Sequence, residues 1–153
     1  MSSEMAWSLE VVCMPVTDID RAKTFYAEQL NFEVDHDTEV SPGVRFVQLT
    51  PPGSGCSIVL GTLSPGARRD VADMPAGTLR GLQLVVPDID RARAELVRRG
   101  VDVSPIAVVG RAGPRPRQEG DDLDNIGFCW FSDPDGNGWA VQQISTRGSD
   151  ASL

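Results

Sequence analysis

Histidine is almost absent from this sequence. The 153 residues contain one histidine, His36, and three cysteines. An iron site of two histidines and one carboxylate needs a second histidine, and a serine or cysteine triad needs a histidine base beside its nucleophile. We therefore expect neither an extradiol-type dioxygenase site nor a covalent triad. His36 lies in the acidic stretch "VDHDTEV", where we expect a surface strand residue rather than a ligand or a base.

Long apolar runs and an excess of basic charge are also missing. No apolar run of 18 residues and no charged-then-apolar leader appears, and the composition is 41% hydrophobic and 24% charged. A formal net charge of −8 opposes binding to a phosphate backbone, and the thirteen arginines are scattered. We expect a cytoplasmic globular protein that binds neither nucleic acid nor membranes. Cys13, Cys56 and Cys129 lie in apolar stretches, as reduced thiols do.

What the sequence does contain is an internal repeat. "VTDIDRAK" at residues 16–23 recurs as "VPDIDRAR" at residues 86–93, which is 70 positions later. Each copy follows an apolar run and precedes apolar residues at helical spacing, so each predicts a strand and then an amphipathic helix. Asp18 and Asp88 occupy N-cap positions, and Asp20 and Asp90 lie in the first turn, where the helix dipole favours acids. We interpret these aspartates as caps, not as catalytic acids.

Each half continues in the same way after its helix. The helices are expected to end at Asn31 and Gly100, because asparagine and glycine adopt the left-handed backbone conformation most readily. "FVQLTPPGSGCSIVL" from Phe46 then lies over "FCWFSDPDGNGWAVQ" from Phe128, and both predict strand, turn and strand. The expected strands are at residues 8–15, 32–39, 44–50, 55–61, 80–87, 101–109, 126–132 and 138–145.

The repeat predicts two βαβββ modules, at residues 1–61 and 80–145. Residues 62–79 are rich in Gly, Pro and Ala without a clean period and are expected to form a linker, and residues 146–153 a polar tail. Residues 110–125 are a second irregular stretch. We expect them to form either a lid or a disordered surface loop, because loops of this length are uncommon.

The motifs of the two halves together resemble one protein family. "MPVTDIDRAKTFYAEQLNFEV", "LVVPDIDRARAELVRRGVDV" and "FSDPDGNGWAVQQI" are similar to segments of the glyoxalase/bleomycin resistance/dioxygenase superfamily, also called vicinal oxygen chelate. The resemblance runs from about Leu9 to Ile144. It implies an α+β fold in which two tandem βαβββ modules place curved mixed sheets around a cleft. It also implies a homodimer and, in many members, a divalent metal in the cleft.

The metal ligands that the resemblance implies are missing at the matching positions. The histidines of the two first strands would fall at Val11 and Gly81, and the carboxylates of the closing strands at Ala140 and Ile58. None of these side chains has a donor atom. A glyoxalase I-like zinc or nickel site is therefore not expected, and no cofactor is assigned. A divalent metal held by other residues is the disfavoured alternative.

Strand alternation defines the expected cleft. If the metal-ligand positions implied by the resemblance face the cleft, the residues two positions away along each strand face the cleft too. Trp139 and Val141 then face the helices. Gln48 and Trp130 lie on a face that is either cleft or core. The expected ligand-binding residues are Val11, Cys13, Gln48, Gly81, Gln83, Trp130, Ala140 and Gln142. Alternatively, Gln142 and Gln143 lie at a solvated dimer edge.

An apolar cup with a few amides favours recognition rather than metal chemistry. The function we favour is binding or sequestering a small organic molecule, aromatic or cationic and antibiotic-like. The alternative is a lyase, isomerase or dioxygenase of the same superfamily with an atypical or metal-free site, built from Cys13, Gln83 and Gln142 or from groups not identified. A third possibility is a structural or regulatory module. No catalytic residue is assigned.

Overall fold

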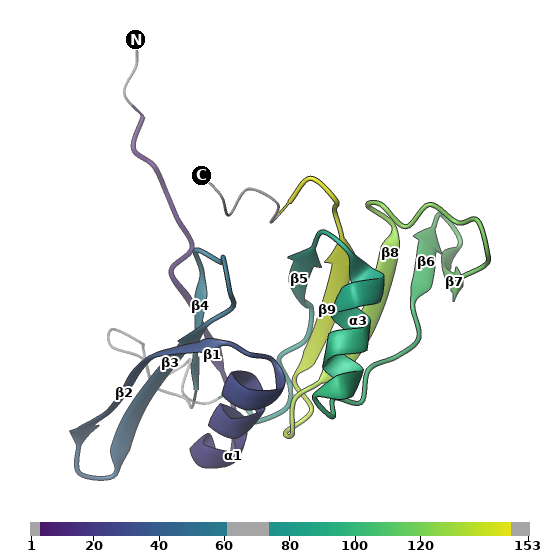
Figure 1. The fold of residues 1–153 in the computed structure, drawn as a ribbon. Helices are drawn as coiled ribbons and strands as arrows, with labels where there is room; N and C mark the ends of the chain where they lie inside the picture. The colour runs from purple at the N-terminus through teal and green to yellow at the C-terminus, as the bar shows by residue number, and fades with distance from the viewer. Residues whose placement is uncertain (1–3, 61–73, 148–153) are drawn as a thin grey trace.

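Two β-sheets, one from each half of the chain, make up the protein (Figure 1). The computed structural model describes residues 4–60 and 74–147. Sheet A has the strand order β1-β4-β3-β2 and comprises β1 (Val11–Met14), β2 (Glu33–Ser41), β3 (Val44–Thr50) and β4 (Ser57–Leu60). Sheet B has the order β5-β9-β8-β6-β7 and comprises β5 (Leu82–Val86), β6 (Ala107–Gly110), β7 (Gly113–Pro116), β8 (Gly127–Ser132) and β9 (Gly138–Gln143).

Both sheets are mixed, as the repeat predicts. The first strand of each half pairs in parallel with the last one, β1 with β4 and β5 with β9, and the other neighbours are antiparallel. This pairing order requires the crossover helix that follows each first strand. The expected α+β architecture is therefore confirmed.

The helices within the described residues are α1 (Ile19–Thr24), its one-turn continuation η1 (Phe25–Gln29), and α3 (Ile89–Arg98). Asp18 and Asp88 cap them as predicted, since each side chain accepts a hydrogen bond of 3.1 Å from the backbone N–H three residues later. Asn31 and Gly100 have φ values of 61° and 83°, the left-handed conformation expected where each helix ends.

The second half departs from the prediction after its helix. The strand expected at residues 101–109 is present only as β6, and the stretch expected to be irregular at 110–125 contains β7, so that prediction was wrong for residues 113–116. Gly110 pairs with Gly113 around a two-residue turn. Arg117 beyond β7 forms an ion pair with Asp90 in the first turn of α3, which holds this segment against the helix. Residues 62–73 of the expected linker and 148–153 of the expected tail lie outside the described residues.

One hydrophobic core joins the two halves. The α1–η1 helix of the first half lies between the sheets (Figure 1). The ring centroid of Tyr26 is 5.8 Å from that of Trp139, and the ring of Phe25 is 6.2 Å from that of Phe131. Trp139 and Val141 are buried and face the helices, as the alternation predicted. No helix in the two described ranges is both long and apolar enough to cross a membrane.

Candidate functional site

The turn between β8 and β9 ties the two halves together through a buried polar network. Asp133 accepts hydrogen bonds from the Tyr26 hydroxyl and from Asn137 Nδ2, both at 2.8 Å, and Trp139 Nε1 donates to the Tyr26 oxygen at 3.0 Å. Asn137 Nδ2 also donates to the Pro15 carbonyl at 3.0 Å. Burial, and then the Asp133 charge, raise the pKa of Tyr26, so its hydroxyl stays protonated and keeps donating. This network fixes β8 and β9, the strands that carry the candidate site.

Burial alternates along β8 and β9 and defines an open face of sheet B. One set of side chains is buried against the helices: Cys129, Phe131, Trp139 and Val141. The set that points the other way is only half-buried: Phe128, Trp130, Ala140 and Gln142. The rings of Phe128 and Trp130 are stacked on this face, with centroids 6.0 Å apart and an interplanar angle of 12°. The sequence did not decide whether the face that carries Trp130 belongs to the cleft or to the core, and its half-buried side chains show that it is not core.

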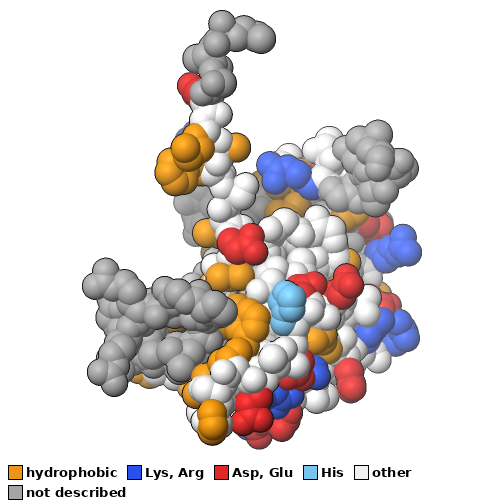
Figure 2. All heavy atoms as spheres, turned by 90° about the vertical axis from the view of Figure 1, so that its left-hand side faces the viewer, with side chains coloured by type: hydrophobic (Ala, Val, Ile, Leu, Met, Phe, Trp, Pro, Cys, Tyr) orange, Lys and Arg blue, Asp and Glu red, His pale blue; other side chains and the backbone are white. Residues whose placement is uncertain are grey.

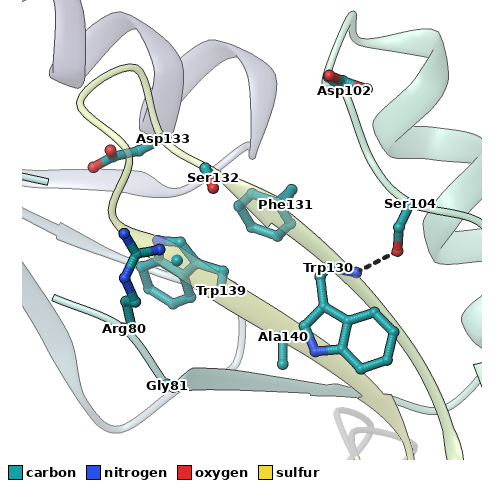
Figure 3. A pocket seen from close by; sticks show the side chains of 11 residues that line it. Arg80, Gly81, Asp102, Ser104, Trp130, Phe131, Ser132, Asp133, Trp139 and Ala140 are labelled. Atoms are coloured by element: carbon teal, nitrogen blue, oxygen red, sulfur yellow. Dashed lines mark hydrogen bonds between the residues drawn. The ribbon is translucent and has the colours of Figure 1, made fainter. Parts of the chain in front are cut away.

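A hollow of about 780 Å³ lies where β5, β8 and β9 meet the turn (Figure 3). Three of the predicted site residues line it: Gly81, Trp130 and Ala140. Ala140 lies directly opposite Trp130 across the β8–β9 ladder, and the indole ring stands beside it (Figure 3). A Cβ atom at Gly81 would meet no atom within 4 Å, so this position adds open space. Two small residues thus leave room beside a large aromatic ring.

Polar residues that the sequence did not reveal also line the hollow. Arg80 and Asp102 bring opposite charges to it, and no carboxylate in the described part of the chain forms an ion pair with Arg80 (Figure 3). Ser104 Oγ accepts a hydrogen bond of 2.9 Å from the backbone N–H of Trp130, and its own N–H donates to the Trp130 carbonyl at 2.9 Å. The lining is therefore more polar than a cup of carbon and amides.

Gln83 and Gln142 are bonded to each other on the open face. Gln83 Nε2 donates to Gln142 Oε1 at 2.5 Å, and Gln142 Nε2 donates to the Asn125 carbonyl at 2.7 Å. Gln143 points elsewhere, since its Oε1 accepts a hydrogen bond of 3.0 Å from the Ile89 backbone N–H at the start of α3. Two of the three amides predicted for the cleft, Gln83 and Gln142, are thus neighbours.

The remaining predicted residues, Val11, Cys13 and Gln48, lie on sheet A. They are half-buried, and none of them lines the hollow, whose lining residues all come from the second half. His36 is exposed, as predicted, but it shares a face with this group because it lies opposite Gln48 and its ring stacks on Phe46 with centroids 5.9 Å apart. Figure 2 shows the histidine with acidic and hydrophobic side chains around it. Within one chain, the predicted site residues form two separate groups.

The match proposed for Ile58 was wrong by one residue. Ile58 pairs with Val12 and is buried in the core, whereas Val59 pairs with Cys13. Ala140 pairs with the residue 70 positions after Cys13, so its counterpart in sheet A is Val59. Valine offers no ligand atom either. No group of three or more His, Cys, Asp or Glu side chains able to hold a metal ion occurs among residues 4–60 and 74–147. The residues at the matching positions do not fit a divalent metal.

The comparison with protein families agrees with this fold. The model of the glyoxalase/bleomycin resistance protein/dioxygenase superfamily matches residues 8–141. The chain belongs to this superfamily.

Solved structures of the superfamily resemble the chain over almost its whole length. TnmS3, an antibiotic binding protein from Streptomyces sp. CB03234, is 34% identical, with a TM-score of 0.67 over 93% of this chain and 100% of that one. A glyoxalase/bleomycin resistance protein from the same organism is 33% identical, with a TM-score of 0.65 over 89% and 100%. A superfamily member from Sphaerobacter thermophilus is 30% identical, with a TM-score of 0.66 over 92% and 99%.

Proposed function

We propose that this superfamily member binds a planar, mainly apolar organic molecule of the antibiotic type in the hollow of sheet B, and holds it without turnover. The observation that carries the proposal is the stacked pair of Phe128 and Trp130 beside the small residues Gly81 and Ala140. A volume of about 780 Å³ suits a drug-sized ligand. The likeness to TnmS3, described as an antibiotic binding protein, supports the same ligand class.

The chemistry of the lining favours recognition over catalysis. An indole face stacks on planar rings, and Arg80 and Asp102 can each orient a polar substituent at the edge of the ligand. Arg80 and Asp102 lie on opposite walls of the hollow, and the third ionisable group of the lining, Asp133, accepts hydrogen bonds within the buried network (Figure 3). We assign no nucleophile, base or metal to the hollow. The alternative of a lyase, isomerase or dioxygenase requires an ion or an acid–base pair at this place.

A homodimer is the second part of the proposal. β1 and β5 each form one edge of their sheet, and edge strands have unpaired backbone groups that a second chain can cover. The first half also exposes large apolar side chains at Leu9, Val34 and Val40, which are 68%, 37% and 57% exposed. In such a dimer the Val11, Cys13 and Gln48 face of one copy covers the hollow of the other. Sedimentation of a dimer in the absence of ligand supports this arrangement, and a monomer contradicts it.

Thermal unfolding with a panel of planar compounds, including naphthalenes and anthraquinones, tests the proposed function. A ligand present at about 100 times its Kd stabilises the protein by about 2.7 kcal/mol, and we expect Trp130→Ala to abolish the shift. Trp7→Ala is the matched control, because Trp7 is 88% exposed in the N-terminal segment and does not line the hollow. Absence of any shift, or a shift that survives Trp130→Ala, contradicts the proposal.

Elemental analysis of the purified protein separates binding from metal-dependent catalysis. We expect no stoichiometric transition metal. A full equivalent of metal that withstands dialysis would favour the enzymatic alternative.

A further inference from the structure

The hydrogen bonds between Gln83, Gln142 and Asn125 have a fixed direction. The Asn125 carbonyl oxygen can only accept a hydrogen bond, so Gln142 must turn its Nε2 amide toward it, at 2.7 Å. Gln142 Oε1 then faces Gln83, which must in turn present its own Nε2, at 2.5 Å. One backbone carbonyl therefore sets the orientation of both side-chain amides.

The consequence is a free acceptor on the open face of sheet B. With Nε2 of Gln83 turned toward Gln142, its Oε1 atom points away from that bond, and no described residue donates to it. Gln83 is exposed, so this oxygen is accessible from the solvent side of the face. A carbonyl oxygen held in this way accepts hydrogen bonds but cannot turn to donate one.

The acceptor lies next to the hollow. Gln83 is directly opposite Ala140 across the β5–β9 ladder, and Ala140 is opposite Trp130 across the β8–β9 ladder. Adjacent strands are about 4.8 Å apart, so Gln83 and Trp130 flank the small Ala140 at a separation of about 10 Å. A planar ligand that covers Ala140 and contacts the indole therefore brings one edge to the Gln83 amide.

We propose that Gln83 is a specificity-determining residue that accepts a hydrogen bond from the ligand, so that the site prefers planar molecules with a hydroxyl or N–H at one edge. Gln142 is the positioning residue that keeps the Gln83 oxygen outward. This inference rests on the proposed function, because it assumes that the ligand covers Ala140.

Calorimetric titration at pH 7 with 2-naphthol and 2-methoxynaphthalene tests the preference. The two rings are the same, but only the hydroxyl can donate, so we expect 2-naphthol to bind about three- to tenfold more tightly. In Gln83→Leu the affinity ratio falls to about one, while the affinity for 2-methoxynaphthalene changes less than about twofold, because the ring contacts remain. Gln118→Leu is the matched control, since its exposed side chain lies in the loop after β7, and it keeps the wild-type ratio.

Gln142→Leu tests the positioning role with a different readout. Without the hydrogen bond to Gln142, the Gln83 amide can rotate and donate to an ether oxygen. We therefore expect 2-methoxynaphthalene to bind more tightly, which lowers the ratio of the affinities for 2-naphthol and 2-methoxynaphthalene. If Gln142→Leu weakens the binding of both compounds equally, Gln142 has a merely structural role and the positioning role is contradicted.

The outcomes separate this inference from the proposed function. If no planar compound of the panel binds, the proposed function fails and the inference fails with it. If neither naphthalene binds while another planar compound does, the inference fails and the proposed function stands. If both bind the wild-type protein equally, or if the preference survives Gln83→Leu, the inference is wrong while the proposed function stands.

Discussion

Replacing Tyr26 by phenylalanine tests the network that fixes β8 and β9 against the first half. The hydroxyl donates to Asp133 at 2.8 Å and accepts from Trp139 Nε1 at 3.0 Å, and all three side chains are buried. A hydrogen bond to a charged group contributes about 1.5–3 kcal/mol, and an indole N–H left without a partner costs about 1–3 kcal/mol. We therefore expect Tyr26→Phe to lower the free energy of unfolding by about 3–5 kcal/mol, measured by urea denaturation.

A double-mutant cycle with Trp139→Phe isolates the hydroxyl–indole contact. In the Trp139→Phe background there is no N–H to leave unpaired, so Tyr26→Phe should cost about 1–2 kcal/mol less than in the wild type. A loss below about 1 kcal/mol for Tyr26→Phe alone, or the same loss in both backgrounds, would refute this account of how the turn is held.

Three further predictions concern single positions. Asp88→Ala should destabilise the protein by about 1 kcal/mol in the same urea assay, because it removes the α3 N-cap. Gly77→Ala should lower the free energy of unfolding by about 2 kcal/mol or more, because the added Cβ would stand 2.1 Å from the Asp135 carbonyl oxygen at a φ of 80°. Gly53 has the same φ and no neighbour within 4 Å, so Gly53→Ala should cost less. Burial raises the pKa of Cys129 from 9.0 to about 11, so this thiol should resist alkylation at pH 8. The unfolded chain loses the thiol proton first, so the free energy of unfolding should fall as the pH rises from about 9 to 11, and this fall should be absent in Cys129→Ala.

Most of the fold follows from local signals in the sequence. The repeat places Asp18 and Asp88 where a cap is needed and Asn31 and Gly100 where a left-handed residue ends the helix, and the structure has all four in those roles. These signals depend on the nearest few residues, so the chain shows them without tertiary information. The β7 strand was missed because its sequence, "GPRP", lacks the β-branched and aromatic residues that predict strands.

The sequence alone did not give the pairing register of β4, and one of the expected metal-ligand positions was therefore assigned to the wrong residue. Gln48 and Val59 are paired 11 residues apart, whereas Trp130 and Ala140 are paired 10 apart, so the turn of the first half is one residue longer. An alignment that follows Phe46 and Phe128 therefore moves the closing strand by one position and puts Ile58 on the wrong face. The pairings with β1 and β5 show the same shift, since Cys13 is opposite Val59 and Gln83 is opposite Ala140.

The candidate site was predictable only in part. The family resemblance implied Gly81 and Ala140, alternation left Trp130 on a face that was either cleft or core, and the three residues meet in one hollow. Arg80 lies just before β5 and Asp102 lies in the loop after α3, and both line the same hollow. No periodic pattern in the sequence predicts that these two segments lie close together. The pairing of the two glutamines likewise depends on a backbone carbonyl from a distant loop.

The central claim is that a planar molecule binds beside Trp130, and the indole N–H signals in a two-dimensional ¹H–¹⁵N NMR spectrum test it most directly. The chain has three tryptophans, Trp7, Trp130 and Trp139, whose signals can be assigned with single Trp→Phe variants. On titration with 2-naphthol, the account predicts the largest shift at Trp130 and none at Trp7. A Trp130 signal that stays in place while the compound binds would contradict it.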